Sequence, residues 1–140
     1  MGRILAIDYG QKRVGIAVTD PLKITARGLT TVKAHEILQY LKDYFEKEEV
    51  ECVVLGYPLK LNNQESEALK YVLQFEKAFR RKFPDIPLEF EDERFTSKMA
   101  VRAMIQGGMK KKERQNKSNI DKMSAAIILQ SYLQEKYFNS

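Results

Sequence analysis

Three apolar segments open the chain, and they lie too close together for helices to connect them. Residues 3–8 and 14–19 are almost continuously apolar, and residues 25–32 are rich in Thr and aliphatic side chains. Gly10 and Pro21 fall in the two connections, where turns are favoured. Because a parallel connection needs a crossover of a dozen or more residues, the pattern predicts an antiparallel meander of three strands.

Helical and strand patterns alternate after the meander. Apolar residues recur at helical spacing in the first, third and last of the following segments, and the second segment is almost continuously apolar. The fourth segment begins a short strand, and the fifth is a helix predicted between a candidate N-cap, Thr96, and the helix-stopping pair Gly107-Gly108. The segments are 34–49, 50–56, 65–82, 88–91, 96–106 and 120–137. This order predicts an α/β fold whose mixed sheet has a parallel part covered by helices.

The bulk composition is that of an ordinary globular protein. The 140 residues fit one domain covering 1–140, with 44% hydrophobic and 31% charged residues. No apolar run approaches the length that spans a bilayer, and the start of the chain lacks a signal-peptide pattern. The single cysteine, Cys52, lies in an apolar run and is predicted to be a buried thiol. We therefore expect a cytoplasmic protein without membrane contact.

The charge balance favours an acidic partner. Lys and Arg number 24 against 19 Asp and Glu, a net charge of +5, which is typical of nucleic-acid binding but does not require it. Five cations gather in one short stretch, namely Lys110, Lys111, Lys112, Arg114 and Lys117. The stretch is a candidate nucleic-acid contact, and the alternative is a solvated loop.

Several kinds of active site are hard to build from this sequence. The only histidine, His35, stands at the start of a predicted helix, with no activating partner nearby. No cluster of Cys and His suits zinc, and no G-x-x-x-x-G-K-[ST] phosphate loop is present. The sequence therefore argues against histidine-dependent nucleophilic catalysis and P-loop chemistry.

Acidic residues instead occupy comparable places. Asp8 ends the first strand, and Asp92 and Glu93 end the fifth. Asp121 begins a helical stripe that continues through Ala125, which places its carboxylate on the inward face of the last helix. Ligands of open α/β sheets gather at the carboxyl ends of strands, and carboxylate oxygens suit Mg²⁺ or Mn²⁺.

Each acid also has a structural interpretation. Asp8 could be a turn residue with Gly10. Asp121 could stabilise the start of the last helix, where acidic side chains are favourable. Asp92 and Glu93 could pair with neighbouring cations such as Arg94. Their joint occurrence in a basic chain favours a metal site.

Four sequence blocks carry a resemblance to a known family. They are residues 7–20 (IDYGQKRVGIAVTD), 56–59 (GYPL), 92–97 (DERFTS) and 121–133 (DKMSAAIILQSYL). In this order they resemble the signature blocks of the YqgF family, also called RuvX, whose members are described as Holliday junction resolvases or pre-16S rRNA nucleases. One departure is Asn63, which stands about where the family usually has Gly.

The resemblance implies an RNase H-like fold related to RuvC. This fold is a three-layer α/β/α arrangement around a five-stranded mixed sheet, with three antiparallel strands first and two strands parallel to strand 1 afterwards. The resemblance also implies metal-dependent phosphodiester cleavage by Asp8, Glu93 and Asp121 as catalytic residues and as ligands of Mg²⁺ or Mn²⁺. Strand alternation alone leaves Asp92 open as an alternative to Glu93.

The leading hypothesis is hydrolysis of precursor rRNA or branched DNA. Asp8 would bind both of two ions, Lys12, Arg13, Arg94 and residues 110–117 would contact phosphates, and Gly10 and Gly15 would allow close backbone approach. A homodimer would suit a symmetric junction. One rival is a nucleic-acid-binding ribosome-assembly factor on a nuclease scaffold. The other is an actin-like or sugar-kinase-like ATPase, for which 140 residues leave room for only one of two required domains.

Overall fold

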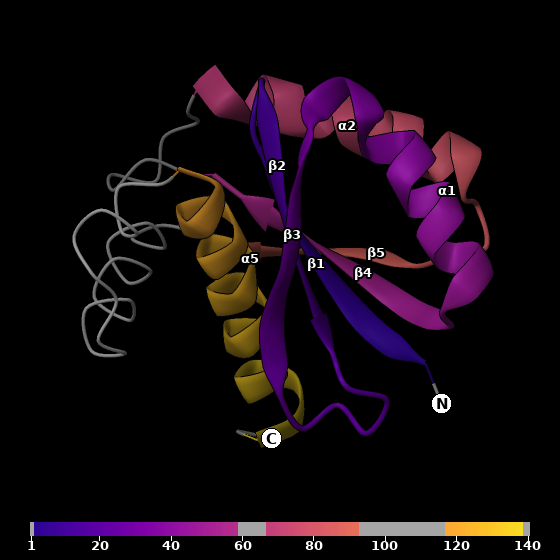
Figure 1. Ribbon diagram of the computed structural model, residues 1–140, viewed down its shortest axis with the longest axis vertical. Coiled ribbons are helices and arrows are strands. Elements are labelled where there is room, and N and C mark those ends of the chain that lie inside the picture. The colour runs from indigo at the N-terminus through magenta and orange to yellow at the C-terminus, as the bar shows by residue number, and fades with distance from the viewer. Residues whose placement is uncertain (1, 59–66, 93–116, 139–140) are drawn as a thin grey trace.

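A five-stranded mixed sheet forms the centre of the computed structural model, which describes residues 2–58, 67–92 and 117–138 (Figure 1). The strands lie in the order β3-β2-β1-β4-β5. Their bounds are β1 Arg3–Tyr9, β2 Arg13–Thr19, β3 Ala26–Lys33, β4 Val50–Tyr57 and β5 Leu88–Asp92. The first strand of the chain is therefore the middle strand of the sheet.

The predicted meander is confirmed. Strand β1 pairs antiparallel with β2, which pairs antiparallel with β3. The amide of Gly10 donates a hydrogen bond to the carbonyl oxygen of Arg13 at 3.0 Å and closes the first turn. The resulting register sets Asp8 opposite Gly15 and Arg13 opposite Lys33.

The parallel half of the sheet is also confirmed. Strand β4 pairs parallel with β1, and β5 pairs parallel with β4. A short 3₁₀ turn, η1 (Ala34–Glu36), and helix α1 (Ile37–Lys47) connect β3 to β4, while helix α2 (Glu67–Lys82) lies between β4 and β5. The carboxyl ends of β1, β4 and β5 consequently meet at one end of the sheet.

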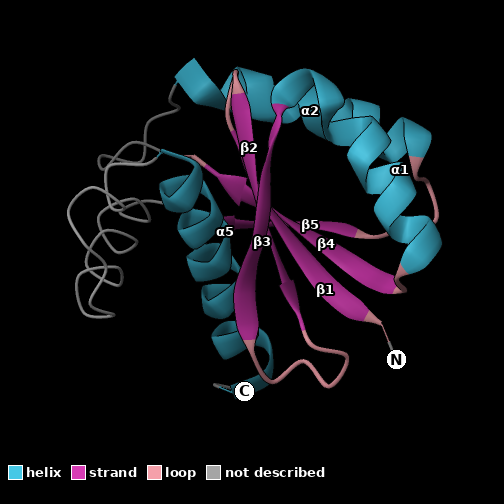
Figure 2. Cartoon of the chain, in the orientation of Figure 1, coloured by secondary structure: helices cyan, strands magenta, loops and turns pink. Residues whose placement is uncertain are grey.

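Helices cover both faces and complete three layers (Figure 2). Helices α1 and α2 pack on one face, where Leu5 and Ile7 belong to the same buried cluster as Phe79 of α2. Helix α5 (Lys117–Leu133), continued by the π-helical segment η2 (Gln134–Phe138), packs on the other face. There Ile4 and Ala6 share a cluster with side chains of α5.

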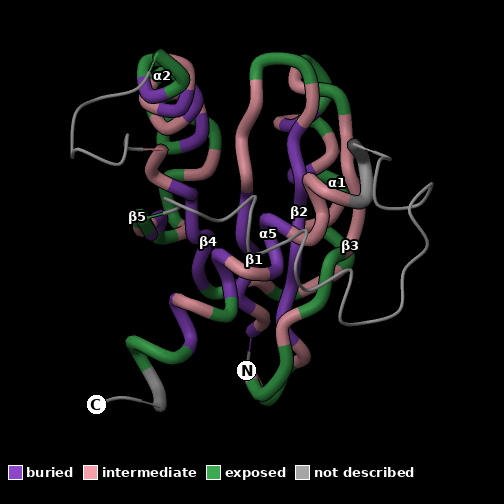
Figure 3. The backbone as a smooth tube through the Cα atoms, turned by 90° about the vertical axis from the view of Figure 1, so that its left-hand side faces the viewer, coloured by how far each residue is buried: buried purple, intermediate pink, exposed green. Residues whose placement is uncertain are grey.

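Burial follows this layering. Figure 3 shows buried residues concentrated in the inner strands, whereas edge strand β3 is mostly exposed or half-buried. Alternation along β1 directs odd-numbered residues to α1 and α2 and even-numbered ones to α5. The same rule determines which face carries each polar residue near the strand ends.

The predicted RNase H-like α/β/α arrangement is confirmed. Observed elements differ from the predicted bounds by a few residues at their ends, where hydrogen bonding is least regular. The predicted helix over 96–106 and residue Asn63 lie outside the described residues. Within the described part of the chain, no helix is long and apolar enough to cross a membrane.

Candidate active site

A cleft of about 410 Å³ opens at the carboxyl end of β1. The first turn of the chain, the start of α2 and the start of α5 all contribute to it. Its lining residues are Asp8, Gly10, Gln11, Lys12, Arg13, Ala68 and Asp121. The cleft therefore joins two of the three predicted acids to two of the predicted phosphate contacts.

Asp8 reaches the cleft because of its position in β1. Ile4 and Ala6 pack against α5, so Asp8 follows them on the same face of the sheet. Its residue is half-buried where the strand leaves the core. The apolar first half of β1 thus anchors a carboxylate at the end of the strand.

Two glycines determine how closely α5 approaches the sheet. A Cβ atom added at Gly15 would lie 2.1 Å from the carbonyl oxygen of Asp121, far inside the distance that atoms tolerate. At Gly28 the added Cβ would lie 3.0 Å from the Cβ of Lys122. The first turns of α5 therefore rest on bare backbone of β2 and β3. Gly15 does allow close backbone approach, and the partner in this structure is the helix that carries Asp121.

Arg13 holds Asp121 directly. Its Nε donates to Oδ2 of Asp121 at 2.8 Å, across 108 residues of sequence. The side chains of Arg13 and Asp121 are 40% and 20% exposed, respectively, so the pair borders solvent. The inward-facing carboxylate thus has the partner that its burial requires. One of the predicted phosphate contacts is engaged with an acid of the site.

Strand β5 brings its acids to both faces of the sheet. Leu88 joins the core cluster under α1 and α2, whereas Glu89 bonds to Tyr132 of α5. Alternation therefore gives Glu91 to the α5 face and exposed Asp92 to the opposite one. Glu93 lies outside the described residues, and the middle acid of the site stays a prediction.

Glu91 is a buried acid that the sequence analysis missed. It is only 7% exposed, and burial together with the carboxylate of Glu135 raises its pKa to about 7. It is opposite Gly56 in the sheet register, near the strand end that carries the cleft. Its position in a Glu-x-Glu alternation was the available signal.

The donor set of the cleft fits a hard divalent cation in part. Asp8 and Asp121 supply carboxylate oxygens, which Mg²⁺ and Mn²⁺ prefer. Among the described residues no group of three His, Cys, Asp or Glu side chains comes together to hold a metal. Of the other predicted residues, Lys117 is the first residue of α5. Those outside the described residues are Glu93, Arg94, Lys110, Lys111, Lys112 and Arg114.

His35 and Cys52 lie outside the cleft lining. The His35 ring is exposed, with Nε2 3.6 Å from Oε1 of Glu36. Burial, reinforced by Glu89, raises the pKa of the Cys52 thiol to about 11. A thiol that stays protonated is a poor nucleophile, so the prediction of a buried structural cysteine is confirmed.

Comparison with known proteins agrees with this architecture. A sequence model of the RuvX family, described as Holliday junction resolvase, matches residues 2–135. A protein of Phocaeicola vulgatus named "Putative pre-16S rRNA nuclease" is 56% identical over 138 residues, covering 99% of each chain. A relative of the same name from Bacteroides thetaiotaomicron is 51% identical over 138 residues, covering 99% of this chain and 100% of its own.

Solved structures with the same fold are more distant in sequence. Thermus thermophilus RuvC in complex with a Holliday junction substrate aligns with a TM-score of 0.59 at 17% identity, covering 98% of this chain and 97% of RuvC. The fowlpox virus resolvase, in complex with Holliday junction DNA, also gives 0.59, at 14% identity, covering 96% and 99%. The match over residues 2–135 and the relatives at more than half identity place the chain in the RuvX (YqgF) family, a family of nucleases.

Proposed function

We propose that the chain is a metal-dependent endonuclease that hydrolyses phosphodiester bonds in structured nucleic acid. The observation that carries the proposal is the convergence of Asp8 and Asp121 on one open cleft lined also by Lys12 and Arg13. Carboxylates beside cations suit a site that binds metal ions and phosphates together. Membership of a nuclease family supports the same activity.

Asp8 and Asp121 would hold Mg²⁺ or Mn²⁺, with Glu93 as the third predicted ligand. When bound, such ions supply a nucleophilic water at neutral pH and charge stabilisation for the leaving oxygen. No side chain is then required as a general base, which agrees with the position of His35 outside the cleft lining.

The remaining cleft residues would orient the carboxylates and the substrate. Arg13 fixes Asp121 through Nε, so that the carboxylate keeps one direction relative to Asp8. Lys12, at the turn between β1 and β2, extends the positive charge of the cleft towards solvent. It would bind a phosphate of the strand that is cut.

The proposed substrates are the 5′ region of precursor 16S rRNA and four-way DNA junctions. The names of the relatives support the first, and the family description and the junction-bound RuvC support the second. We further propose one RNase H-like domain over residues 1–140, in agreement with the family match over 2–135. A cytoplasmic location and a homodimer remain predictions.

A side-by-side cleavage assay tests the proposal. Both labelled substrates are incubated with the protein in Mg²⁺, in Mn²⁺ and in EDTA. We expect metal-dependent cleavage of at least one substrate, and a loss on the order of 10³-fold for Asp8→Asn. The matched control is Asp85→Asn, because Asp85 is exposed in the turn before β5, at the opposite end of that strand from the cleft.

Two results would contradict the proposal. Equal cleavage by Asp8→Asn and the parent chain would remove Asp8 from the active site. Tight binding of either substrate without cleavage in any metal would instead favour the ribosome-assembly factor, because phosphate contacts alone are sufficient for binding.

A further inference from the structure

Lys33 is a cation beside the cleft that neither the sequence motifs nor the cleft lining include. It is the last residue of β3 and is opposite Arg13 in the antiparallel register. Directly opposed residues share one face of a sheet with Cβ atoms about 5 Å apart, and like charges there repel. The end of the β2–β3 pair therefore concentrates two positive charges at the border of the site.

The backbone holds Lys33 close to the first turn of the chain. The amide of Ala34, the next residue, donates to the carbonyl oxygen of Lys12 at 2.9 Å. Lys12 and Arg13 both line the cleft, so this bond and the strand register fix Lys33 beside two cleft residues. Among the described residues, no carboxylate forms a salt bridge with Lys12 or Lys33.

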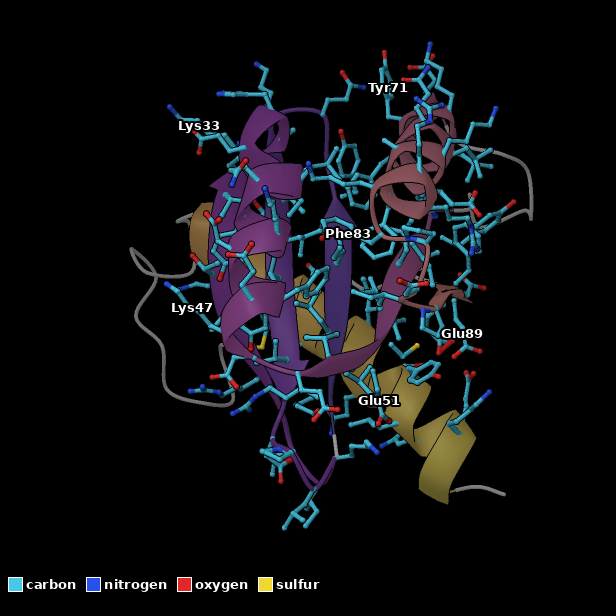
Figure 4. All side chains as sticks on the ribbon, turned by 90° about the vertical axis from the view of Figure 1, so that its right-hand side faces the viewer. Lys33, Lys47, Glu51, Tyr71, Phe83 and Glu89 are labelled. Atoms are coloured by element: carbon cyan, nitrogen blue, oxygen red, sulfur yellow. The ribbon has the colours of Figure 1, made fainter. Side chains whose placement is uncertain are left out.

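Arg13 and Lys33 differ in how much of their positive charge is neutralised within the protein. Arg13 donates through Nε to Asp121, so part of its charge is neutralised within the site. Lys33 is exposed, and Figure 4 shows it at the outer margin of the molecule, near one end of α1. A cation that repels its cross-strand neighbour and faces solvent has its charge available for an external anion.

The geometry points to Lys33 as a phosphate-binding residue for the substrate strand, on the β3 side of the cleft. This inference rests on the proposed nuclease function and extends it by giving the substrate a direction across the protein. Lys33 and Asp8 stand on strands separated by two interstrand spacings, roughly 10 Å. Lys33 would therefore contact a phosphate that flanks the cleaved bond, and the strand would run from β1 across the end of β2 towards β3.

Binding measurements at several salt concentrations test this role. The assay uses Asp8→Asn protein, so that the labelled junction and the labelled rRNA stay intact, and compares Lys33→Gln and Lys33→Arg in that background. The slope of log affinity against log salt is negative, and each lost phosphate contact makes it less steep by about 0.9 for duplex DNA. We expect Lys33→Gln to make the slope less steep by about one and to weaken binding about 3-fold or more at low salt.

Lys47→Gln is the matched control. Lys47 is an exposed lysine at the other end of α1, roughly 15 Å along the helix axis from its first residue (Figure 4). Its substitution removes the same net charge without touching the cleft border. We expect an unchanged salt slope for Lys47→Gln, a restored slope for Lys33→Arg, and an unchanged melting temperature for all three.

The outcomes separate this inference from the proposed function. Equal slopes for Lys33→Gln and Lys47→Gln overturn the role of Lys33, as does a loss of binding that follows a loss of folding. Failure of Asp8→Asn protein to bind either nucleic acid overturns both proposals. A Lys33-dependent slope in a chain whose parent form cuts no substrate overturns the nuclease proposal only.

Discussion

Helix α5 carries a polar cluster near its start and another near its end. Each cluster joins a side chain of the helix to the sheet, but only the cluster near the start lines the cleft. Near its start, Asp121 pairs with Arg13 of β2 beside the 410 Å³ cleft. Near its end, Tyr132 donates a hydrogen bond to Oε2 of Glu89 in β5. Both contacts join the helix to the sheet through a carboxylate.

The far cluster is closed in the sense that its polar groups bond to one another, although the side chains of Glu89 and Lys136 are 42% and 54% exposed. Cys52 donates to the same oxygen of Glu89 at 3.4 Å, and Nζ of Lys136 donates to Oε1 at 3.4 Å. Tyr132 is 7% exposed. The hydrogen bond from Tyr132 lowers the pKa of Glu89, while burial and that carboxylate raise the pKa of Tyr132. The members of this cluster satisfy one another.

The near cluster is open. The Arg13–Asp121 contact engages one oxygen of the carboxylate, and the same two residues line a solvent-accessible cleft with Asp8. The two clusters therefore differ in their access to a cleft shared with a second carboxylate, and the proposed active site depends on this difference.

Asp121→Asn gives the largest expected effect and tests the open cluster. The substitution removes a carboxylate of the site, so we expect cleavage to fall about 10²- to 10³-fold. The salt bridge to Arg13 is partly exposed, so the free energy of unfolding should fall by no more than about 1 kcal/mol. Chemical denaturation and the cleavage assay measure the two quantities. Loss of stability in proportion to activity would make this cluster structural.

Tyr132→Phe tests the closed cluster and should show the reverse pattern. It removes a hydrogen bond to a carboxylate while keeping the ring, so we expect a loss of about 1–2 kcal/mol in the free energy of unfolding. Cleavage by the folded fraction should stay within about twofold of the parent rate, because a twofold change corresponds to well under 1 kcal/mol in barrier height. A large fall in activity without a fall in stability would mean that the far cluster also acts on the reaction.

Acid titration of the closed cluster gives the smallest expected effect. The pKa of Glu89 is lower in the folded chain than its ordinary value of 4.5, so below that value the unfolded state binds more protons. The contribution of Glu89 to the free energy of unfolding is therefore complete above pH 4.5 and is lost as the pH falls through the pKa of the folded chain. The difference in the free energy of unfolding between the parent chain and Glu89→Gln should become smaller as the pH falls below 4.5. A difference that stays constant from pH 6 to pH 3 would contradict it.

Local patterns in the sequence predicted much of this architecture. The almost continuous apolar run over residues 3–8 predicted a buried strand, and the stripe that begins at Asp121 predicted the inward face of the last helix. Both signals depend on neighbours a few positions away. The antiparallel meander of the first three strands followed from connection lengths, which are also local.

Those local patterns could not predict contacts between segments that are far apart in the sequence. The pairing of Arg13 with Asp121 and the position of Lys33 opposite Arg13 depend on register and on how α5 lies across the sheet. Register is set by turns and by packing of the whole face. A residue-by-residue interpretation therefore assigned Arg13 to phosphate alone and omitted Lys33 and buried Glu91.

The close packing of the α5 backbone on Gly15 limits how substitutions can change the geometry of this site. The height of the helix above the sheet at Asp121 is set by contact between two main chains, with no side chain between them to shorten or lengthen. A core that uses side chains as spacers can be adjusted by one methyl group at a time. Here the smallest available change is a whole Cβ at 2.1 Å from a carbonyl oxygen, so the spacing between Asp8 and Asp121 has no gradual route to a different value.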